Sequence, residues 1–425
     1  MEKTGFYAGS FDPFTVRHLT IVKTAAASLK RIIIAVDAAP EKEMTFSAER
    51  RVQLVKSSLS DFVRIGQLFR EMSNCDLFRN EADRRPLPEN WTDCIEVVTF
   101  SGDPFKAAAA AGADVFIADS SENYAPSPEN SYFLEQIGRY CGHSPQLFTV
   151  PADICEETFL YMSALQVKRL CRNNLFVLAA RGVMPSVMDA LATFYLQSVW
   201  LREKVWYSDQ SNSRYYKLAQ LYNDPRRCYH TMAHLAYMLD LLEVYEKREK
   251  TDFDRHHLIL AVFAHDLVNE GTADDVARSA QKVDEFFGQL NRLKTVKKIV
   301  AATDHENDQN TPQSTEEKLI RDLDLAILGD DSFLYWQYVA NLRQEYISFP
   351  LEEIAVMRIA FLKSCLRGNT YSRCRCSAGF SKKTPAKTST TKLPSGSGRL
   401  AADKEKPPAQ FGCLRIKNEE IVSEF

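Results

Sequence analysis

The sequence predicts an α/β domain with a doubly wound parallel sheet, followed by an all-α bundle and a disordered C-terminal tail. Three observations lead to this prediction. In the first half of the chain, short apolar runs rich in β-branched residues alternate with helical segments. From residue 226 to 371 the apolar periodicity is helical throughout. After residue 372 the chain is rich in Ser, Thr, Lys, Gly and Pro, so residues 372–425 cannot bury a core.

The elements of the first half follow from these runs. The expected strands are the apolar runs, and they cover residues 4–8, 31–37, 95–100 and 114–118. The expected helices cover about residues 16–29, the segment from 46 onward with Ser47 as its N-cap, and about 103–111. The run at 31–37 is continuously apolar, which is typical of a fully buried parallel strand. In a doubly wound sheet, ligands bind beyond the carboxyl ends of the strands.

The turn from Gly9 to His18 follows the first expected strand, so it lies at the edge where a ligand would bind. Glycine lets the backbone approach a phosphate closely, and the helix that follows presents free N–H groups at its start. His18 lies one short step into that helix, close enough to reach the same anion. A Gly-Ser pair alone would favour the simpler interpretation, a strand-to-helix turn without a ligand.

The segment YAGSFDPFTVRH at residues 7–18 resembles the nucleotide-binding loop of the bacterial phosphopantetheine adenylyltransferases, which belong to the (H/T)-x-G-H nucleotidyltransferases. The likeness continues through residues 40–52 and is expected to span most of residues 1–195, the first domain. The resemblance implies an enzyme of coenzyme A biosynthesis. With Mg²⁺, such an enzyme transfers the adenylyl group of ATP to 4'-phosphopantetheine and releases diphosphate.

The same resemblance implies roles for single residues. Ser10 would contact the phosphopantetheine phosphate, His18 would stabilise the pentavalent phosphorus, and Lys42 would hold the transferring phosphates. The phosphate-binding set that it implies is Gly9, Ser10, Phe11, His18 and Lys42. These groups would act mainly by positioning and by neutralising charge.

Several positions depart from that family's pattern. Arg17 stands where the motif has glycine, and residues 118–121 read ADSS where the family has R-G-L-R. Residues 162–168 keep one serine of the family's three, and an extra stretch rich in charge and proline runs from about 71 to 91. Charge-assisted hydrogen bonds contribute roughly 1.5–3 kcal/mol each, so the loss of two arginines weakens phosphate binding. Two alternatives stay open for this domain: an active adenylyltransferase, or a pseudoenzyme that only binds nucleotide.

The second half is organised around histidines and carboxylates in metal-ligand order. Residues 229–234 read YHTMAH, so on a helix His230 and His234 would leave the same face about one turn apart. The adjacent His265 and Asp266 can converge on the same cation from the end of a second helix. Imidazole and carboxylate ligands together suit Zn, Mn, Fe or Mg. A single helical histidine is usually a hydrogen-bonded or surface residue, so the combination is what predicts a metal site.

The segments downstream complete this pattern. The chain offers the missing acid in RDLDLAILG at residues 321–329, a fourth histidine at His305, and RQEY at 343–346. With these motifs the second half resembles the HD superfamily of metal-dependent phosphohydrolases. The resemblance implies an HD bundle over residues 226–371, after a junction at 196–225, and a nucleotide or another phosphoester as substrate. One departure is that the family's acidic N-E-E-x-S-A segment reads DVARSA here, without its glutamates.

The metal ligands implied by the HD resemblance are His234, His265, Asp266 and Asp324, with Asp322 as the alternative for the last. His230 would lie behind the ligands or act as the general acid, and His305 is a further candidate. A divalent cation lowers the pKa of a neighbouring water molecule from about 15.7 toward about 7. An imidazole with a pKa of about 6.5 suits protonation of a departing oxygen.

Composition and charge set the remaining expectations. The 425 residues carry a formal net charge of −3, and 45% are hydrophobic and 26% charged, as in an ordinary globular protein. This charge predicts no preference for nucleic acid or anionic membranes. The sequence lacks a run of roughly 18 apolar residues and an apolar core at its start, and its ten cysteines are scattered. We therefore expect a cytoplasmic protein that acts on small molecules, and a homo-oligomer is compatible with the sequence.

Overall fold

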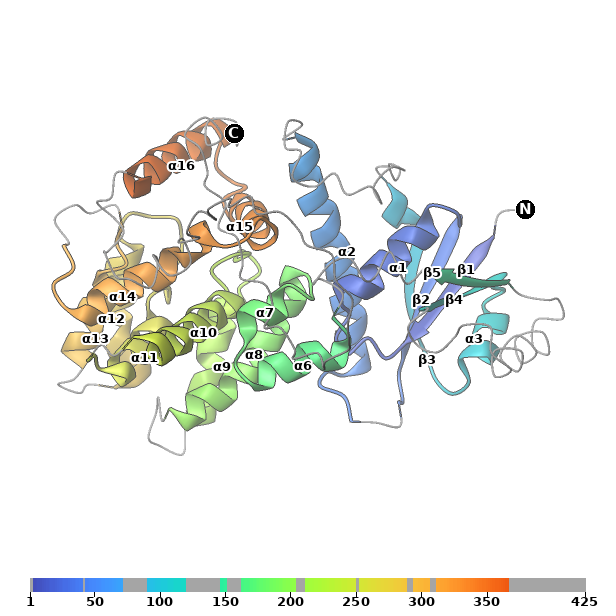
Figure 1. Ribbon diagram of the computed structural model, residues 1–425, viewed down its shortest axis with the longest axis horizontal. Helices are drawn as coiled ribbons and strands as arrows, with labels where there is room; N and C mark the ends of the chain where they lie inside the picture. Colours follow the sequence, from blue (N-terminus) through green and yellow to red (C-terminus); the bar gives the residue numbers. More distant parts are fainter. Residues whose placement is uncertain are drawn as a thin grey trace, which may run out of the picture.

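The computed structural model has a parallel sheet flanked by helices at one end and a group of helices at the other (Figure 1). It describes residues 3–40, 43–71, 90–119, 146–150, 162–203, 211–249, 252–288, 293–305 and 311–366. Lys42, the predicted tail from residue 372 and most of the extra stretch at 71–91 lie outside the described residues. Within the described ranges, no helix is both long enough and apolar enough to cross a membrane.

The sheet has five strands, and each pairs in parallel with its neighbours. The strands are β1 (Thr4–Gly9), β2 (Arg31–Asp37), β3 (Ile95–Phe100), β4 (Val115–Asp119) and β5 (Gln146–Val150). Their order is β3-β2-β1-β4-β5, so β1 lies in the middle, with Phe6 opposite both Ile33 and Phe116. The strand order changes direction between β1 and β4, which is where ligands bind in open α/β sheets. The predicted parallel sheet is confirmed, and β5 is a strand that we did not predict.

Helices cover both faces of this sheet. They are α1 (Val16–Ala26), α2 (Ala48–Glu71), the short 3-10 helix η3 (Trp91–Cys94) and α3 (Pro104–Ala110). Successive side chains of a strand point to opposite faces of the sheet. In β2, Ile32 and Ile34 accordingly pack in the apolar cluster that contains α1, whereas Ile33 packs with Phe105 of α3. The expectation of helices on both sides of the sheet is therefore confirmed.

The boundaries of these helices agree with the capping side chains. Ser47 accepts a hydrogen bond from the Arg50 N–H at 3.3 Å, so α2 begins just after the predicted N-cap. Helix α1 ends at Ala26, earlier than the expected residue 29. Leu29 extends the apolar pattern beyond the helix because its side chain enters the core from the turn that follows.

The described chain after the sheet is mostly helical. Its elements are α6 (Ala164–Arg172), α7 (Phe176–Ala180), α8 (Pro185–Arg202), α9 (Ser211–Tyr222), α10 (Met232–Arg248), α11 (Arg255–Ala264), α12 (Asp275–Phe287), α13 (Leu293–Ala301), α14 (Thr315–Asp324), the 3-10 helix η4 (Leu325–Gly329), α15 (Ser332–Glu345) and α16 (Leu351–Leu366). In α11 every residue from Leu258 to Ala264 is buried, so this helix lies in the middle of the group. The predicted helical region is confirmed, and its identity as an HD bundle stays a prediction.

The apolar core is shared between the sheet and the helical region. One cluster extends from Leu54 of α2 through α8 to α14, and another joins β1 and α1 to α15. Aspartates of neighbouring helices also cap the starts of α7 and α10. Asp240 of α10 accepts from the Val177 N–H at 2.7 Å, and Asp189 of α8 accepts from the Ala233 N–H at 3.2 Å. The helix that carries His234 is thus fixed by a residue before the predicted junction, and the boundaries at 195 and 226 stay predictions.

Candidate metal centre and nucleotide loop

The turn that follows β1 is shaped by a close contact between Gly9 and Phe11. A side chain at Gly9 would meet the Phe11 ring at 2.9 Å, so glycine is needed here. Phe11 has a φ of 46° and is 3% exposed, and its ring lies 5.2 Å from the ring of His18. Phe11 therefore shapes the turn as a core residue, and only its backbone is available for the predicted phosphate contact.

His18 is held by the residue that caps its own helix. The Thr15 N–H donates to His18 Nδ1 at 2.9 Å, and the Thr15 hydroxyl lies 3.0 Å from the same nitrogen. A ring nitrogen that accepts a backbone N–H carries no proton, so neutral His18 has its proton on Nε2. The ring also stacks on Phe14 at 5.4 Å. This arrangement orients an N–H donor suited to an anion, which is compatible with the predicted role.

Two buried charged residues that the sequence did not single out tie this turn to the start of α2. Asp12, 2% exposed, accepts from the N–H groups of Thr45 at 2.8 Å and Phe46 at 3.1 Å, and Lys168 Nζ lies 2.8 Å from it. Arg51, 1% exposed, donates to the backbone oxygens of Ser10 at 2.6 Å and Phe46 at 3.1 Å. Apart from the bond between Arg51 and Phe46, these contacts join segments more than 30 residues apart, so spacing alone does not reveal them.

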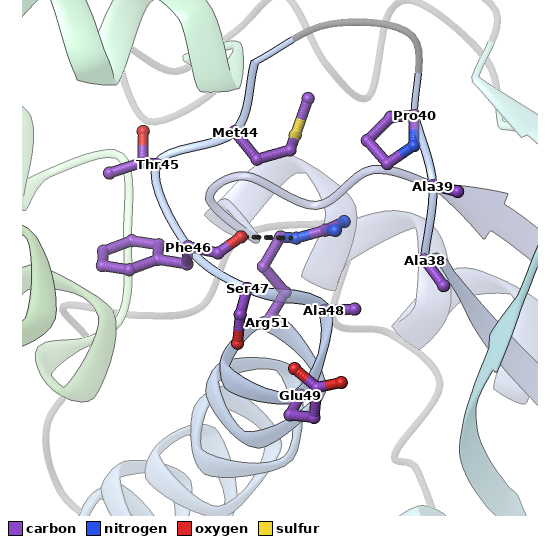
Figure 2. A pocket seen from close by; sticks show the side chains of 10 residues that line it. All are labelled: Ala38, Ala39, Pro40, Met44, Thr45, Phe46, Ser47, Ala48, Glu49 and Arg51. Carbon is purple, nitrogen blue, oxygen red and sulfur yellow. Dashed lines mark hydrogen bonds between the residues drawn. The ribbon is translucent and has the colours of Figure 1, made fainter.

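A pocket of about 530 Å³ opens between the end of β2 and the start of α2. Figure 2 shows Arg51 reaching from α2 to the backbone of Phe46 at this pocket. The described lining comes from residues 38–40, 44–49 and 51, whereas Gly9–Phe11 and His18 do not line it. Lys42, a predicted phosphate-binding residue, lies outside the described residues. The pocket and the predicted phosphate loop are therefore connected through Arg51 rather than forming one cavity.

The helical region brings together the predicted metal ligands. His234 comes from α10, His265 is the C-cap of α11, Asp266 follows it, and Asp324 ends α14. The Nε2 atoms of His234 and His265 are 3.2 Å apart. Asp324 Oδ1 lies 3.1 Å from His234 Nε2, and Asp266 Oδ2 lies 2.9 Å from His265 Nε2. Two imidazoles and two carboxylates from three separate segments thus face one small volume.

The donor set fits a divalent cation. The Val262 carbonyl lies 2.9 Å from His265 Nδ1, and because a carbonyl only accepts, Nδ1 carries the proton. The lone pair of neutral His265 is then on Nε2, directed at the other ligands. His234 and His265 are 3% and 1% exposed, so two imidazole rings share a buried site with two acids. Such nitrogen and oxygen donors suit Zn, Mn or Fe, and a cation would offset the paired negative charges.

The electrostatics keep both carboxylates ionised. Burial raises the pKa of Asp266, but the neighbouring His265 and His230 outweigh it and lower the pKa to about 2. For Asp324, burial is likewise outweighed by hydrogen bonds from His234 and His305, which hold its pKa well below the usual value. Burial lowers the pKa of His234. Ionised acids beside a neutral imidazole are the protonation states that bind a metal.

The contacts distinguish between the two candidate aspartates of α14. Asp324 contacts His234, and its other oxygen, Oδ2, lies 2.8 Å from His305 Nε2. Asp322 is buried two residues earlier, and side chains two apart on a helix do not face each other. The geometry therefore favours Asp324 as the fourth ligand, and His305 is placed to orient it.

His230 differs from the sequence-based expectation. We expected His230 and His234 on one helical face, but this was wrong, because α10 begins at Met232 and Thr231 is its extended N-cap. His230 therefore lies in the turn before the helix, with its ring 5.8 Å from that of His234. Its Nδ1 lies 2.5 Å from Glu345 Oε1. Burial lowers the pKa of His230, but Glu345 and Asp266 outweigh it and raise the pKa to about 9.

The comparisons with known proteins concern the first part of the chain. The sequence model of the family described as Cytidylyltransferase-like matches residues 6–118, from β1 to β4. With the parallel sheet and its flanking helices, this match supports a nucleotidyltransferase-like N-terminal domain. The match ends before the helical region that holds the predicted metal ligands.

Proteins named phosphopantetheine adenylyltransferase are among the relatives. The one from Methylobacterium nodulans is 29% identical over 150 residues, which make up 35% of this chain and 73% of the relative. The one from Clostridium botulinum (strain Hall) is 46% identical over 54 residues, which make up 13% of this chain and 33% of the relative. The chain thus covers only about a third of the second relative's length, so this likeness concerns a part of that enzyme.

Proposed function

We propose that the helical region is a metal-dependent phosphohydrolase of the HD type, which hydrolyses a nucleotide or another phosphoester. The observation that carries this proposal is the buried meeting of His234 and His265 with Asp266 and Asp324. The distances from the Nε2 atoms of the two histidines to the carboxylate oxygens of the two aspartates are between 2.9 and 3.9 Å. A divalent cation, when bound by these residues, supplies positive charge to a phosphate and acidifies water.

The chain's own residues would prepare the site for that reaction. The Val262 carbonyl fixes the tautomer of His265, and His305 holds one oxygen of Asp324 so that the other faces the cluster. His230 would hold the proton that the departing oxygen needs, because its pKa of about 9 keeps it charged near neutral pH. The near-complete burial of His234 and His265 excludes bulk water, which strengthens the electrostatic interactions inside.

Turnover tests this proposal. The full-length protein should hydrolyse at least one compound in a panel of nucleotides and phosphoesters when Mn²⁺ or Mg²⁺ is added. The turnover of the His234→Ala variant should fall by a factor of about 100 or more. Removal of a group that only orients a metal ligand already costs about 10–100-fold. Lack of turnover by the wild type across the panel with either cation would refute the hydrolase proposal.

The N-terminal domain favours a second candidate function, pantetheine-phosphate adenylyltransferase. The relatives' names and the family match over residues 6–118 support it, as does the oriented His18. Arg17, in the first turn of α1, departs from the family's glycine. We expect diphosphate release from ATP with Mg²⁺ only in the presence of 4'-phosphopantetheine, with loss in His18→Ala. Binding of ATP without diphosphate release would instead favour a domain that only binds nucleotide.

A further inference from the structure

Arg358 lies in the middle of α16 and is a buried cation, only 7% exposed. Helix α16 contributes none of the four candidate metal ligands, which come from α10, the end of α11 and α14. The guanidinium carbon lies 4.8 Å from the centre of the Tyr338 ring and 5.5 Å from the centre of the Phe361 ring. The positive charge is thus held against two aromatic rings, one from α15 and one from α16.

These two rings connect Arg358 with the candidate metal centre. The Phe361 ring is 6.4 Å from that of His305, the residue that holds an oxygen of one candidate ligand. The Tyr338 ring is 4.5 Å from that of Tyr229, which in turn packs against the ring of a second candidate ligand at 4.9 Å. Arg358 therefore approaches the cluster from α16, on the side bounded by His305 and Tyr229.

The electrostatics of Tyr229 place the same charges together. Burial raises the pKa of the Tyr229 hydroxyl, and Tyr338 and the carboxylates of Asp324 and Asp266 raise it further. Arg358 acts on the same hydroxyl in the opposite direction. The guanidinium and the two negative candidate ligands thus act on one buried ring.

The charge balance of the site gives Arg358 a use. When a divalent cation is bound, the two carboxylate ligands offset its charge. Burial raises the pKa of Glu345, but His230 outweighs it, so the pair of His230 and Glu345 is neutral as a whole. A phosphate monoester carries a charge of about −1.5 to −2 at pH 7, and burying such a charge without a partner is costly. A guanidinium offers a rigid fork of N–H donors that matches phosphate oxygens.

We propose that Arg358 is a substrate-binding residue, whose guanidinium binds the phosphate oxygens of a phosphate monoester at the candidate metal centre. This inference rests on the proposed phosphohydrolase function and deepens it, because it names the doubly charged monoester as the substrate class. Arginine stays protonated in proteins, so Arg358 supplies charge and hydrogen bonds and exchanges no proton. A phosphodiester carries one negative charge and gains less from this residue.

A purely structural role for Arg358 makes a different prediction. If the side chain only packed α16 onto α15, its loss would act through the fold or through loss of metal, and all anions would bind more weakly by the same factor. If it binds phosphate, its loss acts most on a doubly charged ligand. Lysine keeps the charge but not the fork, so Arg358→Lys should lie between the wild type and a neutral variant.

The experiment measures hydrolysis of 4-nitrophenyl phosphate with Mn²⁺ by full-length wild type, Arg358→Gln, Arg358→Lys and Lys363→Met. Inorganic phosphate and the singly charged dimethyl phosphate serve as competitive inhibitors. We expect Arg358→Gln to raise KM and the inhibition constant of inorganic phosphate by about 10–100-fold, and to change kcat much less. The inhibition constant of dimethyl phosphate should rise by less than about fivefold, and the Mn²⁺ content should not change. Lys363, an exposed cation of the same helix, gives the control, and Lys363→Met should match the wild type.

The outcomes separate this inference from the proposed function. Wild-type turnover with unchanged KM and phosphate inhibition in Arg358→Gln, or with an equal rise for both inhibitors, would overturn the substrate-binding role alone. Loss of Mn²⁺ from Arg358→Gln would assign the arginine to the fold and would overturn it as well. Arg358→Met gives the same comparison if Arg358→Gln fails to fold. Absence of wild-type turnover on 4-nitrophenyl phosphate and on every other phosphoester of the panel would contradict the hydrolase proposal and this inference with it.

Discussion

At the scale of single residues, hydrogen bonds to the backbone decide what each histidine can do. The Val262 carbonyl leaves His265 with a lone pair on Nε2, whereas the Thr15 N–H leaves His18 with a proton on Nε2. The same kind of side chain is thus suited to bind a cation in one place and to donate to an anion in the other. These assignments agree with the two chemistries that the sequence motifs predict.

The choice between Asp324 and Asp322 is tested by a matched pair of variants. We expect Asp324→Asn to weaken Mn²⁺ binding by at least about 10–100-fold, because it removes a charged oxygen that faces His234 at 3.1 Å. Asp322→Asn, with a substitution of the same kind two residues earlier, should bind Mn²⁺ as the wild type does. Isothermal titration of the full-length protein with Mn²⁺ measures both. The reverse ranking of the two variants would assign the ligand to Asp322.

Asp240 makes stability depend on pH. Burial raises its pKa from 3.8 to about 6, although the Val177 N–H partly offsets the rise, and the side chain is 4% exposed. The folded state therefore binds the proton more tightly than the unfolded state does. The stabilisation of the folded state by protonated Asp240 is fully present below about pH 4 and is lost as the pH rises through about 6.

The variant Asp240→Asn should remove this dependence, since its amide oxygen can still accept from Val177. We expect the free energy of unfolding of the variant, relative to wild type, to rise by about 2–3 kcal/mol between pH 4 and pH 8. Urea unfolding at the two pH values measures it, and Asp252→Asn at an exposed position is the control. A constant difference between wild type and Asp240→Asn across this range would refute the assignment.

At the scale of elements, α2 and α15 join the sheet to the region that holds the candidate metal ligands. In Figure 1, α2 lies between the sheet and α15. Just past the middle of α2, Arg64 donates to Asn341 of α15 at 2.6 Å, and Asp61 accepts from the Ser186 N–H of α8 at 2.9 Å. Helix α15 in turn ends at Glu345. The turn that carries His230 therefore depends on an element of the nucleotidyltransferase-like part.

The buried ion pair between α7 and the start of α15 should be important for stability. Arg181 lies 2.9 Å from Asp330 and 2.6 Å from Asp331, and the side chains of Arg181 and Asp330 are 8% and 11% exposed. We expect Arg181→Met to lower the free energy of unfolding by about 3–5 kcal/mol, because it leaves Asp330 buried without its partner. The exposed Arg226, paired with Asp224, gives the control, Arg226→Met.

Exposed ion pairs contribute about 0–1 kcal/mol, so Arg226→Met should change the free energy of unfolding little. Urea unfolding of both variants at neutral pH gives the comparison. Equal losses in Arg181→Met and Arg226→Met would show that burial of the pair does not matter.

At the scale of the whole molecule, the sequence predicts what is local and misses what is distant. The strand at 31–37 and the helical region follow from periodicity, because side-chain spacing along the chain reports which faces are buried. The residues that the family resemblance implies as metal ligands lie close together, although they come from three separate segments of the chain. Glu345 binds a turn 115 residues earlier, and Asp12 binds a segment 33 residues later, and no local pattern reports such pairs. The prediction for His230 was wrong because the sequence pattern does not show where α10 begins. Thr231 is the N-cap of this helix, so His230 precedes it.

Metal content is the most direct test of the proposed centre. We expect the full-length protein, loaded with Mn²⁺ and freed of unbound metal, to retain about one equivalent, and His265→Ala to retain far less. His257→Ala should retain the wild-type amount, because His257 lies in the same helix but pairs with Asp254 at 3.0 Å. Elemental analysis gives all three values. A wild type that retains no metal, or a His265→Ala variant that retains as much as the wild type, would contradict the metal centre.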